Sequence, residues 1–198
     1  GSADDVRVLV VFCHPVETSY GAALKDRIVA SLAPRHHVDL LDLYAEKFDP
    51  VMSREEWLGY HEIPDNIAPV AGYVERLKAA DAIVFCFPAW SFGPPAMLKG
   101  WLDRVMLPGV SFHIQPDGRV TGGLTNLKKL AAVVTFGQTW WRARLMGNYP
   151  RKLVRRYLRR NIGMQKPALF LAHYAMNVST PDTRARFLAK VGEAMSAF

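Results

Sequence analysis

The chain has 198 residues, half of them hydrophobic, and a formal net charge of +7 at pH 7. That length can bury one substantial core, so we expect a single domain over residues 6–198 after a tag remnant and polar tail at residues 1–5. No apolar run approaches the roughly 20 residues that span a bilayer, and no leader peptide is visible, which predicts a cytoplasmic protein without stable membrane insertion. Two cysteines and scattered histidines exclude a disulfide framework and a metal site.

Strand-like runs alternate with helical patterns along the chain. The first run, residues 7–13, is almost continuously apolar, as is typical of a strand covered on both faces. Further strands are expected at residues 38–43, 81–87, 129–136 and 168–174. Helices are expected from residues 18–19 to about 32, and at residues 70–79, 95–106, 150–162 and 180–197. Residues 44–66 form an irregular connection, and residues 112–121 a turn between short extended pieces.

This alternation predicts an α/β fold with a five-stranded parallel sheet and helices on both faces. The common order for five such strands is 2-1-3-4-5, and ligands then bind beyond the carboxyl ends at the switch in strand order. The loops after the first, third and fourth strands, residues 14–20, 88–94 and 137–141, would share that edge. The functional site is expected there.

The first two of these loops carry different ligand chemistry. Thr18 and Ser19 stand where a helix begins, and unpaired N–H groups at such a terminus favour anions. Taken alone, this loop is more simply explained as an ordinary helix cap without a ligand. Trp90 and Phe92 would give a flat conjugated ligand its apolar walls, or would simply pack the turn. Neither phosphate-binding fingerprint, GxxxxGK[ST] or GxGxxG, is present. The following helix is expected to bury Leu98, Trp101, Leu102 and Val105.

Three segments together resemble a known family. The stretches FPAWSFGPPAMLKGWLDRV, CHPVETSYGAALK and DLYAEKFDPVMS are similar to the flavodoxin-like NAD(P)H quinone oxidoreductases, a family that also includes modulator-of-drug-activity and potassium-efflux ancillary reductases. The resemblance covers residues 6–136 well and the remainder more weakly. It implies a flavodoxin-like fold, a bound flavin, NAD(P)H as co-substrate and a homodimer.

The resemblance also implies roles for individual residues. The flavin phosphate region would be held by His14, Thr18, Ser19 and Tyr20. The ring would be lined by Pro88, Ala89, Trp90, Ser91 and Phe92, and its edge by Thr135, Phe136, Gly137 and Gln138. Phe136 and Gln138 depart from the TTGG usual in the family, and Ser91 replaces one bulky aromatic. The Tyr and His of the larger quinone reductases have no evident counterpart, which leaves Trp140 and Tyr149 as the available catalytic aromatics.

The activity that the resemblance implies is ping-pong hydride transfer from NAD(P)H through the flavin to a quinone or a related azo or nitro acceptor. One alternative is an electron carrier acting on a protein partner, which the positive charge disfavours. The other is a flavin-binding ancillary subunit with a regulatory role. FAD and FMN both remain possible, and the long connection at residues 44–66 favours FAD.

Positive charge is concentrated in one part of the chain. Eight Arg or Lys and no acidic residue lie between Arg142 and Arg160. The helix at residues 151–160 is either a solvated charged face or an anion-binding face, for the flavin pyrophosphate, the 2′-phosphate of NADPH or acidic residues of a second subunit. Arg142 and Arg144 are the expected NADPH phosphate ligands. Without a nucleic-acid motif, we expect no nucleic-acid partner.

Overall fold

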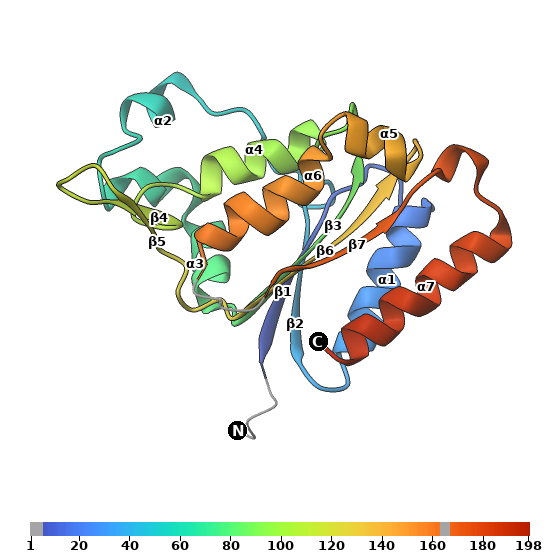
Figure 1. The fold of residues 1–198 in the computed structure, drawn as a ribbon. Coiled ribbons are helices and arrows are strands. Elements are labelled where there is room, and N and C mark those ends of the chain that lie inside the picture. The colour runs from blue at the N-terminus through green and yellow to red at the C-terminus, as the bar shows by residue number, and fades with distance from the viewer. Residues whose placement is uncertain (1–5, 163–166) are drawn as a thin grey trace.

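The computed structural model describes residues 6–162 and 167–198, so the expected tag remnant lies outside the described residues. Five parallel strands form one sheet in the order β2-β1-β3-β6-β7 (Figure 1). Their bounds are β1 Arg7–Phe12, β2 His37–Asp42, β3 Ala82–Ala89, β6 Lys129–Phe136 and β7 Leu169–His173. The order matches the predicted 2-1-3-4-5 arrangement, and the predicted fold class is confirmed.

Helices cover both faces of the sheet. The helices α1 (Tyr20–Leu32) and α7 (Pro181–Ser196) lie on one face. The other face carries α3 (Ala71–Ala79), α4 (Ala96–Val105), the short α6 (Tyr149–Lys152) and the π-helical turn η2 (Leu153–Leu158) (Figure 1). In β1, Leu9 and Val11 therefore join one buried cluster while Val8 and Val10 join the other. This two-sided burial explains the continuously apolar run.

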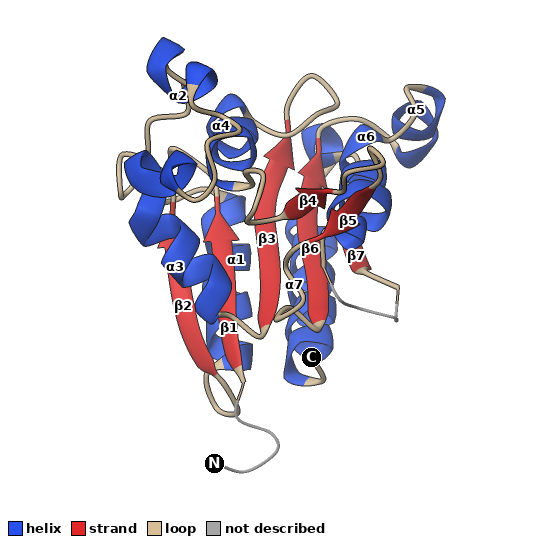
Figure 2. Cartoon of the chain, turned by 90° about the vertical axis from the view of Figure 1, so that its left-hand side faces the viewer, coloured by secondary structure: helices blue, strands red, loops and turns tan. Residues whose placement is uncertain are grey.

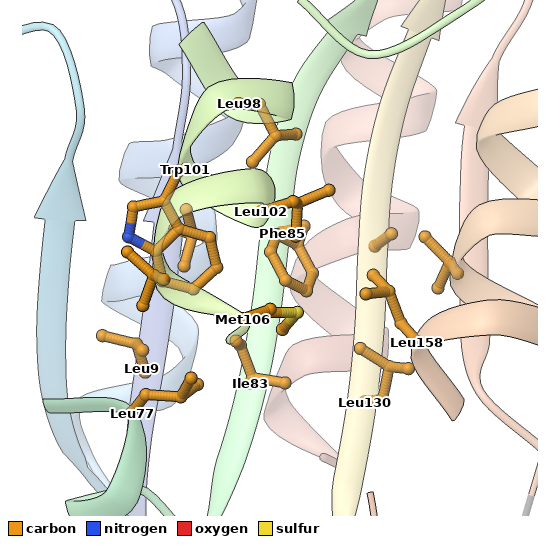
Figure 3. Packing of buried hydrophobic residues seen from close by; sticks show 14 of the residues in the cluster. Leu9, Leu77, Ile83, Phe85, Leu98, Trp101, Leu102, Met106, Leu130 and Leu158 are labelled. Carbon is orange, nitrogen blue, oxygen red and sulfur yellow. The ribbon is translucent and has the colours of Figure 1, made fainter. Parts of the chain in front are cut away.

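The helix α4 supplies the centre of one core cluster. Trp101 is fully buried and meets Phe85 edge to face, with ring centroids 6.1 Å apart (Figure 3). Leu98, Leu102 and Val105 are buried on the same helix, so its predicted core face is confirmed. Tight packing continues on its outer side, where Gly100 faces Pro50 of the connection between β2 and α3.

Several elements were not expected from the sequence. The connection at residues 44–66 contains α2 (Arg54–Leu58), which begins with a capping box between Ser53 and Glu56, and leads into the 3-10 helix η1 (Asp65–Val70). The loop after β6 continues into α5 (Trp140–Leu145), and η3 (Met176–Val178) follows β7. The expected helix at residues 150–162 is present as one helical run over residues 149–160, in which α6 continues into the π-helical η2. The strands β4 (Phe112–Ile114) and β5 (Val120–Gly122) form the anticipated hairpin.

The strand β3 is longer than predicted and runs through Pro88 to Ala89. Its last residues pair only with β6, because β1 ends at Phe12 opposite Cys86 and the Cys13 N–H closes that side on the Cys86 carbonyl at 3.0 Å. Pro88 has the same strand parity as Cys86, so its missing N–H faces the side that β1 has left. A proline is tolerated in a central strand at such a place.

Both cysteines are buried in the sheet. Cys13 follows β1 and Cys86 lies in β3, and burial raises the pKa of each thiol to about 12. Among the described residues, no helix is both long and apolar enough to cross a membrane.

The contact between Gly100 and Pro50 gives a stability prediction. A Cβ on Gly100 would lie 2.3 Å from the Pro50 carbonyl oxygen, so Gly100→Ala should force α4 and the connection apart. We expect it to lower the free energy of unfolding by about 1–3 kcal/mol, measured by urea denaturation. Gly72→Ala in α3 is the matched control, since a Cβ there meets nothing within 4 Å and alanine favours helix. Equal stability of the Gly100→Ala variant and wild type would contradict this packing.

Candidate functional site

The loops after β1, β3 and β6 meet beyond the carboxyl edge of the sheet. Figure 2 shows these strands pointing to one edge, with α5 near that edge. Because β1 and β3 are neighbours while β2 continues on the far side of β1, the switch in strand order lies between these two loops. The structure thus brings together the three loops that the sequence analysis singled out.

The first loop presents unpaired backbone donors at the start of α1. Ser19 caps the helix, its Oγ accepting from the Ala22 N–H at 3.0 Å. Within the described part of the chain, the N–H groups of Tyr20 and Gly21 have no protein acceptor. Thr18 is exposed beside them. Free donors at the positive end of a 13-residue helix make this loop suitable for a phosphate group.

His14 links the first loop to the second. Its Nδ1 accepts from the Val16 N–H at 3.0 Å, which requires that nitrogen to be unprotonated. Burial lowers the pKa of His14, so the ring is neutral near pH 7 and carries its proton on Nε2. The ring meets Trp90 edge to face with centroids 6.1 Å apart. His14 therefore positions Trp90 and keeps one N–H donor at the same edge.

The second loop is a strained turn. Trp90 and Gly93 exchange both backbone hydrogen bonds at 2.9 Å, and the residues between them, Ser91 and Phe92, have φ of 50° and 59°. Two successive positive φ values characterise the type I′ turn, which normally requires Asn or Gly. Left-handed backbone at non-glycine residues costs roughly 1–3 kcal/mol each and gathers at functional sites. In the described chain, the Ser91 and Phe92 N–H groups have no protein acceptor, and Trp90 is 43% exposed.

The third loop is braced by the segment after β7. The Phe136 ring is buried and stacks on Tyr174 with centroids 4.7 Å apart, so only its backbone is available to a ligand. Gly137 faces Asn177, whose Oδ1 would lie 3.1 Å from an added Cβ, and the Gln138 carbonyl accepts from the Ala175 N–H at 2.8 Å. Thr135 is half-buried at the end of β6.

Other predicted site residues lie at varying distances from this centre. The Tyr20 phenol donates to the Arg184 carbonyl at 2.8 Å, so the side chain faces α7 and only its N–H points to the helix terminus. Pro88 is buried and Ala89 half-buried, both within β3. Tyr149 faces the second loop, since its Cδ1 would lie 3.6 Å from a Cβ added to Gly93. Trp140 instead lines a cavity between α5, α6 and η2.

The two expected NADPH phosphate ligands differ in their surroundings. Arg142 donates through Nη1 to Gln138 Oε1 at 2.9 Å and lies over the Trp141 ring at 5.1 Å. Arg144 lies with Trp140 on the wall of a cavity of about 540 Å³. Of the two arginines, Arg144 lines this partly open cavity, whereas Arg142 is engaged by Gln138 and Trp141.

Sequence reasoning missed two residues that organise this region. Asn148 adopts a left-handed conformation, with φ of 41°, between α5 and α6, and its side chain donates to the Tyr174 hydroxyl at 2.9 Å. The signal for Asn148 was present in the Asn-Tyr-Pro triplet, because Asn tolerates the left-handed conformation and proline is common in the first turn of a helix. Tyr174 carried no comparable signal.

Comparisons with known proteins agree with the fold. A family model described as "Flavodoxin-like fold" matches residues 6–195. The curated relative NAD(P)H dehydrogenase [quinone] 1 of Cavia porcellus is 34% identical over 123 residues, covering 54% of this chain and 45% of that protein. An uncharacterized NAD(P)H oxidoreductase of Haemophilus influenzae is 33% identical over 134 residues, covering 65% of this chain and 63% of its own length. The chain thus spans less than two thirds of either relative.

Solved structures match over nearly the whole chain. Smu.1420 from Streptococcus mutans has a TM-score of 0.86 at 26% identity, with coverage of 97% of this chain and 100% of that one. The NAD(P)H:quinone oxidoreductase from Methanothermobacter marburgensis has a TM-score of 0.83 at 22% identity and shares the fold, with coverage of 97% and 98%. The chain belongs to the flavodoxin-like family that includes the NAD(P)H quinone reductases.

Proposed function

We propose that this protein is a flavin-dependent NAD(P)H oxidoreductase that reduces quinones or related acceptors such as azo and nitro compounds. The observation that carries the proposal is the strained Trp90–Gly93 turn at the same edge as the start of α1. Each of the two has a pair of N–H groups without an acceptor among the described residues. The names of curated relatives, NAD(P)H dehydrogenase [quinone] and NAD(P)H oxidoreductase, support it.

The residues present fit a flavin. The Tyr20 and Gly21 N–H groups, Thr18 and the His14 Nε2–H form a donor set suited to its phosphate. Trp90 offers an exposed aromatic surface next to the Ser91 and Phe92 N–H groups, which suit the polar edge of a conjugated ring. A bound flavin would supply the hydride transfer chemistry, while the protein binds and orients the reactants.

The chain's own residues would position the reactants in turn. Fixed N–H donors in the Trp90–Gly93 turn can stabilise negative charge on a neighbouring group without having to reorganise. Tyr149 lies against the same turn and is exposed, so it can contact a planar donor or acceptor there. When NAD(P)H and the electron acceptor occupy the same surface in turn, the kinetics are ping-pong. We further propose a homodimer, for which the exposed Trp141, Leu145 and Met146 beside this edge provide apolar surface.

Two other classes of function make different predictions. An electron carrier for a protein partner accords poorly with the net charge of +7, since such carriers are generally acidic. A flavin-binding regulatory subunit would bind the cofactor without turning over NAD(P)H and a quinone. The spectrum of the purified protein and its response to NAD(P)H separate these cases.

The first prediction tests the proposed function directly. Purified protein, reconstituted with flavin if necessary, should show visible flavin absorption that NADH or NADPH bleaches without oxygen and that a quinone restores. Chromatography of the acid-released flavin decides between FAD, which the length of the connection at residues 44–66 favours, and FMN. A protein that gains no flavin on reconstitution would sink the proposal, and bound flavin without bleaching would favour the regulatory subunit.

A second prediction concerns the wall of the turn. Trp90→Ala should weaken flavin binding by about tenfold or more, equivalent to about 1.4 kcal/mol, because the exposed indole beside the free N–H groups is lost. Fluorescence titration of the flavin-free protein measures this. Trp57→Ala is the matched control, since Trp57 is 65% exposed and lies on α2. Equal flavin affinity of the two folded variants would mean that the flavin ring does not bind against Trp90.

A third prediction concerns the choice of donor. Arg142→Ala combined with Arg144→Ala should raise KM for NADPH about tenfold while changing KM for NADH little, because a charge-assisted contact to the 2′-phosphate is lost. Arg144→Ala alone should give most of the effect, since Arg142 already donates to Gln138. Arg119→Ala on the hairpin, where Arg119 pairs with Asp117 at 2.6 Å, is the control. Steady-state kinetics with NADPH and with NADH measures both KM values. An unchanged ratio of the two KM values in the double variant would refute the assignment.

A further inference from the structure

A basic cavity lies beside the candidate site, between α5, α6, η2 and the residue that follows β7. Its volume is about 540 Å³, within the range of small-molecule pockets. Figure 1 shows α5 and α6 next to one another, with α5 beyond the carboxyl ends of β6 and β7. The lining residues are Trp140, Arg144, Gly147, Asn148, Arg151, Lys152, Arg155, Arg156 and Tyr174. None of them belongs to the loops after β1 and β3, so this space is separate from the proposed flavin turn.

Five cationic side chains line this cavity, and none of the described residues on its wall carries a carboxylate. Within residues 6–162 and 167–198, none of the five forms an ion pair. Arg151 and Arg155, like Lys152 and Arg156, are four residues apart in sequence, a spacing at which like charges on a helix destabilise each other. The fold alone leaves this repulsion uncompensated, and a bound anion would offset it.

Neutral groups in the cavity are arranged as donors. The Asn148 side chain donates to the Tyr174 hydroxyl at 2.9 Å, so the phenolic hydrogen of Tyr174 remains available for an acceptor. Stacking of Tyr174 on the buried Phe136 fixes the position of that hydroxyl. Arg155 is held in place by its own Nε, which donates to the Ala168 carbonyl at 3.2 Å. Fixed donors and charges of one sign give the cavity the character of an anion site.

The neighbouring cavity provides a contrast. It has a volume of about 660 Å³ and lies between α4 and the same α6–η2 segment. Its wall includes the carboxylate of Asp103, which pairs with Lys99 at 2.7 Å, and the apolar side chains of Leu102 and Leu153. The neighbouring cavity shares Lys152 and Arg156 with the first and also has Arg160 on its wall. Its positive charge is partly balanced by Asp103, whereas the described residues that line the first cavity include no carboxylate.

We propose that the basic cavity binds a ligand carrying two or more phosphate groups. A single phosphate would occupy a small part of the volume and face few of the five cations, whereas a di- or triphosphate chain can reach several at once. Two sources share this chemistry, a free polyphosphate anion and the linked phosphates of a dinucleotide. The site requires no flavin, so the proposal stands independently of the proposed activity; only its dinucleotide form rests on that activity.

Isothermal titration of the full chain with inorganic tripolyphosphate tests the site. Wild type should bind with a measurable heat that decreases as NaCl is raised, because screening weakens charge contacts. Arg144→Gln combined with Arg151→Gln should weaken binding at least tenfold. The control is the double variant Arg160→Gln with Arg119→Gln, which also removes two positive charges. Arg160 lines the neighbouring cavity but not the basic one. Circular dichroism verifies that each variant is folded.

The outcomes separate the possible occupants. Displacement of tripolyphosphate by NADPH would support the proposal with a dinucleotide as ligand, and binding unaffected by NADPH would support it with a free polyphosphate. No binding by wild type at low salt, or equal loss in both double variants, would overturn it. It would also fail if the cavity variant dissociated a dimer in sedimentation while tripolyphosphate did not bind. Because flavin absorption and its bleaching are measured separately, these failures would leave the proposed function untouched.

Discussion

The hydrogen bond from the Cys13 N–H to the Cys86 carbonyl determines where the candidate site can form. It is the last contact between β1 and β3, and beyond it β3 continues for three residues bonded to β6 alone. The first loop then turns away into α1, while the second rises from β3 as a strained turn. His14 spans the opening between them by its contact with Trp90. The switch in strand order thus lies where two neighbouring strands end at different heights.

Charge is organised differently on the two halves of the molecule. Around β2 and α4, acidic groups have arginine partners: Arg76 contacts Asp39 and Glu46 at 2.8 Å, and Arg104 contacts Glu56 at 2.7 Å. Burial alone would raise the pKa of Asp39, but hydrogen bonds and charge from Arg76 and Arg7 outweigh it and hold that pKa below its usual range. The segment from Arg142 to Arg160 lacks acidic residues altogether. The positive net charge of the chain therefore comes from one segment, which lies on one side of the candidate site.

The sequence predicted those features that depend on local pattern. Continuous apolar runs indicated strands buried on both faces, and the Ser19 cap and Trp101 core position followed from ordinary helix rules. Features that depend on distant partners were not predictable. Nothing near Phe136 indicates that Tyr174 covers it, and the Tyr20 phenol turns to α7 because of the Arg184 carbonyl, 164 residues away. The end of β3 was misplaced because the length of its neighbour decides whether Pro88 is tolerated.

The burial of both cysteines has a chemical consequence for the proposed activity. Quinones are electrophiles that add to thiolates, and an enzyme that handles them risks alkylating itself. Cys13 and Cys86 are close to the candidate site along the chain, yet both are buried and both remain protonated at neutral pH, since burial raises each thiol pKa to about 12. The thiol is a far weaker nucleophile than its anion. The sheet that positions the loops of the candidate site thereby also shields the two cysteine side chains, whose thiols would otherwise react with an electrophilic substrate.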